Sequence, residues 1–517
     1  ATRLVARIEA GILDTDTTQT PVVVPVRWVF EHPTVASLAS AVESVAREND
    51  STGAARSVPL VVGVRPDRVP LSPAQMRLWW LNRYDPESTA YALPFAVRLS
   101  GDLDPQALAA AVADVVGRHE ILRTRYPEIG GVPFQDIRST IEVTDGLELF
   151  PTALSADRLD QVLTGHAQAR FDLTEQVPLR MHLYTLTETT TDGAGEVFVL
   201  VVIVHHVAAD GFSGGVWTRD LLTAYRSRRE GRAPAWAPLP VQYADYSLWQ
   251  HRALGAPDDP ESVAALEREF WVDRLTGAPT VAALPTDRPR PQIASQRGAQ
   301  VPFTVPEDLV TRIQRSARDR GVSEFMVAHT AFAIMLTRWA EIGDVVIGTP
   351  IAGRGHQALD EMIGMFVNTL ALRTPIPAAA TVGEVLDQVK EADLEAFAHA
   401  VLPFERVVEA LDPPRSAAHA PLVQVMLAFQ NLPGGDFTLP GVTAHTLTPN
   451  IGTTHLDLTL TLTPGNATTA GNGADTAIRR REWGGEFSYA TDLFDHSTVT
   501  ALAARFVSVL DQITTDP

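Results

Sequence analysis

The sequence contains no cysteine, and this absence excludes several classes of function at once. A chain of 517 residues without a thiol forms no disulfide, no cysteine nucleophile and no cysteine-ligated metal site. It has no apolar run near the roughly 18 residues that a membrane-spanning helix needs. We find neither a secretory signal pattern nor a glycine-rich phosphate loop. The cytoplasm is therefore the expected location.

Positive charge is also scarce. The chain has 42 Lys and Arg against 62 Asp and Glu, which gives a net charge of −20. A surface this acidic disfavours nucleic acid as the main partner, because phosphate binding relies on basic side chains. Hydrophobic residues make up 45% of the chain and charged residues 20%, which is ordinary for a globular protein without a membrane segment. The length predicts two or three domains.

One stretch combines a strand pattern with polar chemistry. Residues 197–204 form an unbroken apolar run rich in β-branched residues, which predicts a strand buried on both faces. His205 and His206 end this run, and a short loop leads to Asp210-Gly211, before Ser213, which is expected to cap a helix. Side chains alternate along a strand, so the two histidines should point to opposite faces. A histidine at a strand end is more often a packed core residue than a catalytic one.

The spacing HHxxxDG is more specific than a lone histidine. It resembles the signature of nonribosomal peptide synthetase condensation domains, which the related epimerisation domains share. Six further segments match the motifs of that family in order across roughly 450 residues. They are SPAQMRLWWL at 72–81, RHEILRTRY at 118–126, YADYSLW at 243–249, IGMFVNTL at 363–370, LPFERVV at 402–408, and PLVQVM at 421–426 followed by Gln430-Asn431.

The first 48 residues resemble a different family. Trp28-Val29-Phe30 followed by Pro33-Thr34 is similar to the end of a peptidyl carrier protein, so 1–48 is interpreted as the C-terminal part of a helical carrier domain. The alternative is a helical N-terminal extension. Residues 49–68 are mostly small, polar or Pro/Gly-punctuated and predict a linker.

The resemblance to a carrier implies a serine that holds phosphopantetheine. Such a serine belongs to a motif of the LGGxS type, which has no copy in the sequence. By resemblance, the serine would lie just before Ala1. We therefore assign no cofactor-binding residue within the 517 residues.

The fold class expected from the resemblance is α/β (α+β), with two chloramphenicol-acetyltransferase-like lobes in a V shape. The first lobe would span 69–235 and the second 236–517, with a floor loop and a latch crossing between them. The residues of the second half independently predict a helix after Ser323, a strand at 345–348 that leads into a loop with Arg354, and later strands at 456–463 and 483–489.

The resemblance also implies the chemistry. A condensation domain is a peptide-bond-forming acyltransferase: the α-amine of an acceptor on a downstream carrier attacks the thioester of a donor on an upstream carrier. The implied cofactor is 4′-phosphopantetheine on the carriers, without a metal, and adenylation domains of the same synthetase are further partners. The SPAQMRLW opening resembles domains that accept an L-configured or achiral donor.

By resemblance, the candidate catalytic residues are His206, His205, Asp210 and Gly211. His206 would face the tunnel between the lobes and accept the amine proton, orient the amine or stabilise the tetrahedral intermediate, whereas His205 would be structural. Asp210 is a base or a strut, and its position in a turn favours a strut paired with Arg354. Gly211 permits close backbone approach and can present its N–H to the site.

The other motif residues are assigned structural roles. Arg118 and Glu120 are expected on a solvated helix face, while the aromatic residues of the fourth motif are expected to anchor a loop. The motif residues expected to pack are Leu78, Trp79 and Trp80.

Two other functions stay open at this point. The first is epimerisation, although epimerisation domains lack the SxAQxRLW opening seen here. The second is a non-catalytic docking module, as in relatives that recruit other enzymes and usually lose the active-site histidine or aspartate.

Overall fold

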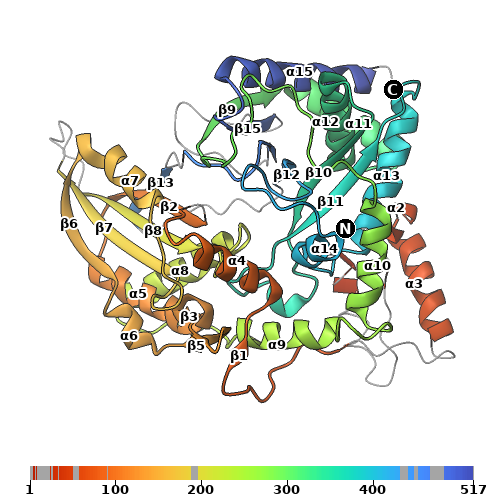
Figure 1. The fold of residues 1–517 in the computed structure, drawn as a ribbon. Helices are drawn as coiled ribbons and strands as arrows, with labels where there is room; N and C mark the ends of the chain where they lie inside the picture. The colour runs from red at the N-terminus through yellow and green to blue at the C-terminus, as the bar shows by residue number, and fades with distance from the viewer. Residues whose placement is uncertain are drawn as a thin grey trace.

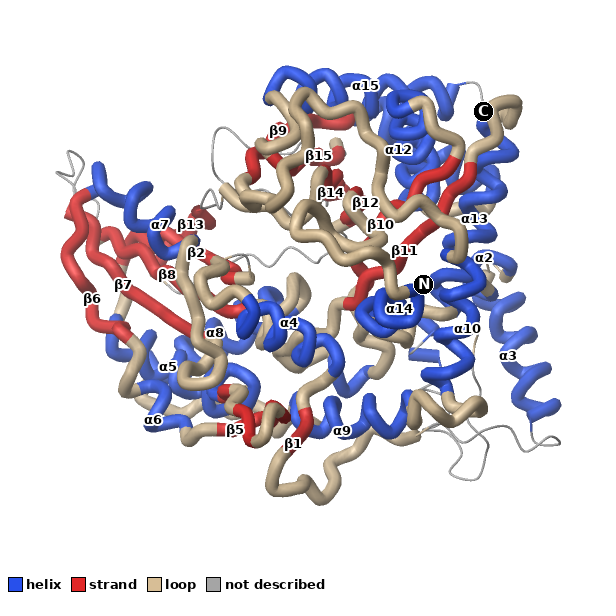
Figure 2. Tube along the Cα trace, in the orientation of Figure 1, coloured by secondary structure: helices blue, strands red, loops and turns tan. Residues whose placement is uncertain are grey.

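The protein consists of two α/β lobes, each built on its own sheet (Figure 1). The computed structural model describes residues 4–5, 7–8, 24, 27–32, 34–49, 58–89, 91–187, 196–430, 441–447, 452–465 and 482–515. Figure 2 shows strands in the interior of each lobe and helices around them. The α/β class and the two-lobe arrangement expected from the sequence are confirmed.

The first lobe contains a five-stranded sheet in the order β13-β2-β8-β7-β6, in which only the β6–β7 pair is parallel. Its central strand β8 is buried along nearly its whole length, as the apolar run predicted. In Figure 1 helices α5 and α8 lie on one side of this sheet and α7 on the other. The strands are β2 (Ala92–Gly101), β6 (Glu148–Ser155), β7 (Leu179–Thr187), β8 (Val197–His205) and β13 (Val442–Leu447), and the helices are α5 (Pro105–Arg118), α6 (Thr140–Thr144), α7 (Leu159–Ala167) and α8 (Ser213–Arg229).

The second lobe contains a six-stranded sheet in the order β11-β10-β12-β14-β15-β9, with parallel pairs only between β10, β12 and β14. The predicted strand–loop and late-strand patterns are present, and the helix expected after Ser323 is α12, which Ser323 caps by accepting a hydrogen bond from the Met326 backbone. The strands are β9 (Gly298–Val305), β10 (Asp344–Ile351), β11 (Asn368–Pro375), β12 (Val425–Phe429), β14 (Leu458–Pro464) and β15 (Trp483–Ala490), and the helices are α10 (Val263–Leu275), α11 (Glu307–Arg320), α12 (Glu324–Ala340), α13 (Val382–Ala398), α14 (Phe404–Leu411) and α15 (His496–Thr515).

Segments from the second half of the chain complete the first lobe. Strand β13 pairs with the edge of β2. The loop between β10 and β11 contributes Leu359, Met362, Ile363 and Phe366 to the core of the first lobe. A small sheet of β1 (Val69–Pro70), β3 (Thr124–Arg125), β4 (Glu128–Ile129) and β5 (Val132–Ile137) lies at the base of the molecule, beside α9 (Tyr243–Leu254) (Figure 1). The remaining elements are α4 (Pro73–Tyr84), η1 (Glu120–Arg123), η2 (Ala156–Arg158) and η3 (Gln357–Leu359).

Two N-terminal helices, α2 (Trp28–Glu31) and α3 (Val35–Asn49), lie against the outer side of the second lobe, beside α10 and α13 (Figure 1). These two helices share a small apolar cluster with Val5 and Val24. The guanidinium of Arg27 donates to Glu391 on α13 at 2.9 Å.

Parts of the predicted carrier segment and linker lie outside the described residues. These parts include Ala1, Pro33 and residues 50–57. The structure therefore does not test the expectation that a carrier serine lies just before Ala1, and this expectation stays a prediction.

Candidate functional site

Strand β8 ends at His205, whose side chain is enclosed in the first lobe. Its backbone N–H donates to the carbonyl of Pro178 at 2.9 Å, and its Nδ1 accepts from the Val207 N–H at 3.0 Å. Only 4% of the residue is exposed. Burial, aided by the neighbouring His206, lowers the pKa of His205 to about 3, so this ring is neutral near pH 7.

His206 follows the last residue of the strand and is partly exposed, whereas His205 is buried; the prediction that the two side chains point to opposite faces stays a prediction. Its backbone N–H donates to the carbonyl of Tyr91 at 2.8 Å, which fixes the position of the residue. The ring Nδ1 is buried and has no hydrogen-bond partner among the described residues. Burial lowers the pKa of His206, and the charge of Arg77 lowers it further, against the opposing influence of Asp210 and nearby backbone groups. The imidazole is therefore neutral at physiological pH.

Asp210 is saturated by structural contacts. Its Oδ1 accepts from the Ser213 N–H at 2.9 Å and from Arg354 Nη2 at 3.1 Å, and it lies 2.8 Å from the Ser213 hydroxyl. Its Oδ2 accepts from the Phe366 N–H at 3.2 Å. Ser213 begins α8 rather than capping it, so the cap prediction was wrong: its hydroxyl instead accepts from the Asp210 N–H. The adjacent Gly211 is exposed to solvent.

The expected ion pair between Asp210 and Arg354 is present and buried, with side-chain exposures of 0% and 3%. Arg354 also donates to the carbonyls of Leu359 and Met362, and its guanidinium lies 4.3 Å from the centre of the Phe366 ring. The chain can turn here because Gly353 has φ +61°, and a Cβ at this position would lie 1.8 Å from the Phe366 carbonyl. Arg354 therefore binds both Asp210 and the loop that follows Arg354 in the chain.

We call residues 359–366 the bridging loop, because they belong to the second half of the chain but pack in the first lobe. Its backbone is bound at successive residues. The Gly364 N–H donates to the Ser213 hydroxyl at 3.1 Å, and the Tyr243 hydroxyl donates to the Met365 carbonyl at 2.6 Å. The turn that follows the two histidines and the bridging loop thus form one hydrogen-bonded unit.

The side chains of Arg118 and Glu120 in the second motif are buried and partly buried, respectively, and both are ion-paired, contrary to the prediction of a solvated helix face. Arg118 is only 6% exposed at its side chain and donates to Asp220 on α8 at 3.0 Å. Glu120 pairs with Arg65 at 2.7 Å, and the same guanidinium binds both carboxylate oxygens of Asp245 at 2.9 Å. These charges are paired because a buried unpaired ion would be costly.

The partners Asp220, Arg65 and Asp245 were missed in the sequence. Asp220 did leave a signal, because it lies on the buried face of α8 with Val216, Trp217 and Ala224, at the spacing of an apolar stripe. A carboxylate in such a stripe needs a buried cation or donor. Arg65 lies in the predicted linker and left no comparable signal.

The aromatic motif residues are placed mostly as expected. Tyr243 and Tyr246 pack against the Phe366 ring, with ring centres 5.2 and 4.8 Å apart, and so anchor the bridging loop. Leu78 and Trp79 are buried, but Trp80 is 57% exposed, so its expected packing was wrong.

Two contacts join the lobes close to His206. Arg77 of α4 pairs with Glu405 of α14 at 2.9 Å. The ring of Tyr91, whose carbonyl holds His206, stacks on His455 of the second lobe with ring centres 4.7 Å apart. His206 therefore lies where side chains of both lobes meet.

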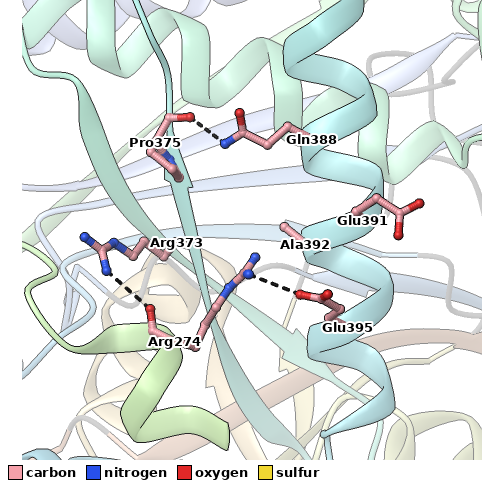
Figure 3. A pocket seen from close by; sticks show the side chains of 7 residues that line it. All are labelled: Arg274, Arg373, Pro375, Gln388, Glu391, Ala392 and Glu395. Carbon is pink, nitrogen blue, oxygen red and sulfur yellow. Dashed lines mark hydrogen bonds and ion pairs between the residues drawn. The ribbon is translucent and has the colours of Figure 1, made fainter.

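A separate pocket of about 320 Å³ lies on the outer side of the second lobe, between α10, β11 and α13 (Figure 3). Several of its polar side chains already have partners, such as Arg27 for Glu391 and Asp344 for Arg373. Arg274 pairs with Glu395 at 3.1 Å, and Gln388 donates to the Pro375 carbonyl at 2.6 Å. The lining residues include neither His205 nor His206.

Within the described ranges, no three His, Cys, Asp or Glu side chains are grouped as metal ligands. Among the described helices, none is both long and apolar enough to cross a membrane.

Comparison with known proteins gives a consistent result. The family described as "Condensation domain" matches residues 66–517. A probable non-canonical nonribosomal peptide synthetase, CymA, from Salinispora arenicola is 45% identical over 88% of this chain, and a dimodular nonribosomal peptide synthase from Bacillus subtilis is 40% identical over 95%. The chain spans only 6% and 20% of the lengths of these two relatives. The X-domain from teicoplanin biosynthesis, solved alone and in complex with OxyB, is 35% identical with a TM-score of 0.79. In the structure of the domain alone, the match covers 89% of this chain and 98% of that domain.

Proposed function

The chain belongs to the condensation-domain family of nonribosomal peptide synthetases, and on this premise we propose that it joins two carrier-bound substrates through a peptide bond. The acceptor α-amine attacks the donor thioester carbonyl, the C–N bond forms, and the C–S bond breaks. The amine proton ends on the released phosphopantetheine thiol or in solvent. Since an α-amine has a pKa of about 8, a useful neutral fraction exists near pH 7.

The observation that carries this proposal is that the residues of the HHxxxDG motif differ in how far structural contacts occupy their side chains. Structural contacts saturate Asp210 and enclose His205. By contrast, His206 keeps a neutral imidazole at the junction of the lobes, and its buried Nδ1 has no hydrogen-bond partner among the described residues. We therefore assign the reaction to His206, with Nε2 accepting a hydrogen bond from the acceptor amine. Positioning two tethered reactants can supply roughly 7–11 kcal/mol in favourable cases, so strong base catalysis is not required.

The other candidate residues support this arrangement. Asp210 acts as a strut rather than a base, because four donors already contact its carboxylate. Arg354 neutralises it and binds the bridging loop. Gly211, exposed beside the turn, stays a candidate backbone N–H donor to the substrate.

The substrates would arrive on carrier domains through 4′-phosphopantetheine. We assign residues 1–48 to the end of the donor carrier, 49–68 to a linker, 69–235 to the first lobe and 236–517 to the second, except that 359–366 and 442–447 complete the first lobe. The serine that holds the donor arm would lie before Ala1, and the shared apolar cluster of Val5, Val24 and Val42 supports a folded N-terminal unit. The acceptor carrier and adenylation domains would belong to the rest of a synthetase, and the SPAQMRLW opening supports an L-configured or achiral donor.

A second candidate function is docking of another enzyme, as the OxyB complex of the similar X-domain suggests. The two functions make different demands on His206. Peptide-bond formation needs its imidazole at the junction of the lobes, whereas docking on an outer surface does not. The retained HHxxxDG signature favours catalysis.

The test is a single-turnover assay with an upstream carrier loaded with candidate aminoacyl groups and a separate aminoacyl carrier as acceptor. Mass spectrometry would detect the dipeptidyl acceptor carrier. We expect product with the parent protein and none with His206→Ala, while the parent and His206→Ala bind carriers equally. Product formation that survives His206→Ala would contradict the assignment. Carrier binding without product from any donor would favour the docking function.

A further inference from the structure

His119 is a buried histidine to which the proposed reaction assigns no role. It lies between α5 and η1, in the second motif, and only 1% of it is exposed. Its Nε2 lies 2.9 Å from Asp220 Oδ2, and its Nδ1 accepts from the Ile363 N–H at 3.3 Å. Because Asp220 is also bound by Arg118 and Arg219, it is a carboxylate that can only accept. The proton must therefore sit on Nε2, which leaves a lone pair on Nδ1 for Ile363.

The Ile363 N–H belongs to the bridging loop. It lies next to the groups of this loop that contact the motif turn, the turn that follows the two histidines. Ser213 binds Gly364, and Asp210 binds Phe366. His119 thus holds the same loop from the side of α5, while Arg354 holds it from within the second half of the chain. These attachments end on consecutive or nearly consecutive peptide groups of one loop, which also donates to Asp210 through the Phe366 N–H.

We propose that His119 is a positioning residue, which fixes the bridging loop through the Ile363 N–H and thereby holds the turn beside His206 in its reactive arrangement. The role in catalysis rests on the proposed peptide-bond formation, whereas the contact with the loop does not. Histidine suits this position because one neutral ring donates to a carboxylate with Nε2 and accepts from a peptide N–H with Nδ1. Asparagine reproduces the position of Nδ1, and glutamine that of Nε2.

The charged groups facing His119 make the contact sensitive to protonation. Asp220 and Arg219 lie on α8, Arg118 ends α5, and Glu361 in the bridging loop contacts Arg219 at 3.3 Å. Burial lowers the pKa of His119 despite the bond to Asp220, so the ring is neutral at physiological pH. Protonating Nδ1 at lower pH would replace the acceptor with a second donor and repel the Ile363 N–H.

The experiment compares His119→Asn with His119→Gln by hydrogen–deuterium exchange of the 359–366 segment and by kcat and KM. We expect His119→Gln to exchange roughly tenfold faster in this segment, because it loses the acceptor for Ile363. Its kcat should fall about tenfold with KM within about twofold of the parent. His119→Asn keeps the acceptor and should retain loop protection and most of kcat.

His329 offers a matched control in the second lobe. It is equally buried, with Nδ1 3.0 Å from the buried Asp393 and Nε2 3.2 Å from Thr374, and its contacts lie away from the motif turn and the bridging loop. The variants His329→Asn and His329→Gln should change thermal stability without changing loop exchange or kcat below the melting temperature.

Hydrogen–deuterium exchange of the bridging loop is also measured across a pH series. A purely packing role of His119 would not make loop protection depend on pH. After correction for intrinsic exchange rates, loop protection in the parent should fall as the pH is lowered beneath the ordinary range of a histidine, because burial lowers the pKa of His119, whereas in His119→Asn it should not change with pH. Equal effects of both His119 variants, or loop protection independent of pH in the parent, would overturn the proposal. If the parent forms no peptide bond but its loop exchange follows the expected order, the proposed function fails while the positioning contact stands.

Discussion

Replacing Asp210 by asparagine separates a structural from a chemical role for this residue. The amide keeps one acceptor for Ser213 but leaves the Arg354 guanidinium buried without its anion. Removing one partner of a buried ion pair typically costs about 3–5 kcal/mol. We expect the lower end, about 3 kcal/mol, because the carbonyls of Leu359 and Met362 and the Phe366 ring still solvate Arg354. For a cooperative unit of roughly 150–250 residues, this loss lowers the melting temperature by about 6–12 °C.

Calorimetry measures the loss, and turnover is measured well below the melting temperature of each variant. A double-mutant cycle with Arg354→Gln provides the control. Since Asp210→Asn and Arg354→Gln together leave no unpaired charge, the double variant should be more stable than the sum of the single effects by about 1 kcal/mol or more. If Asp210→Asn is as stable as the parent and yet loses all turnover, the strut interpretation is wrong and Asp210 takes part in the chemistry.

Three further predictions concern the site. His206→Ala should abolish product formation while leaving the melting temperature within about 2 °C, because the side chain is partly exposed and its Nδ1 has no hydrogen-bond partner among the described residues; a loss of folding would contradict this. Burial lowers the pKa of His205 to about 3, so the unfolded chain takes up this proton first as the pH falls. His205 alone should therefore lower the unfolding free energy by about 1.4 kcal/mol per pH unit between about 6.5 and about 3, and His205→Asn should reduce the slope of acid-unfolding curves by this amount. Exhaustive chelation should leave turnover unchanged, and activity that disappears and returns with added zinc would refute a metal-free site.

The sequence predicted the elements with a strong local signal. The apolar run at 197–204 indicated a buried strand, and Ser323 marked a helix start. The pair of Asp210 and Arg354 came from resemblance rather than from spacing, since 144 residues separate the two. The two-lobe fold also came from resemblance, because no local pattern says which strands share a sheet.

The missed contacts share one physical reason. Arg118 looked like an exposed helix residue because its partner Asp220 lies 102 positions away. The bridging loop is bound largely through peptide N–H and carbonyl groups, as at Ile363 and Met365, and nearly every residue type carries these groups. A sequence shows which side chains are present, but it does not show which backbone groups a distant histidine or tyrosine will reach.

The pairing of β13 with β2 limits how this chain can be dissected. A fragment that stops after the first lobe, near residue 235, would lose Val442–Leu447 and leave the backbone of β2 open along six residue pairs. An unpaired edge next to the buried β8 invites pairing with another copy of the fragment. It would also lose the bridging loop and its apolar side chains. Chimeras made by exchanging one lobe between relatives should therefore carry residues 359–366 and 442–447 together with the first lobe, although both lie in the other half of the chain.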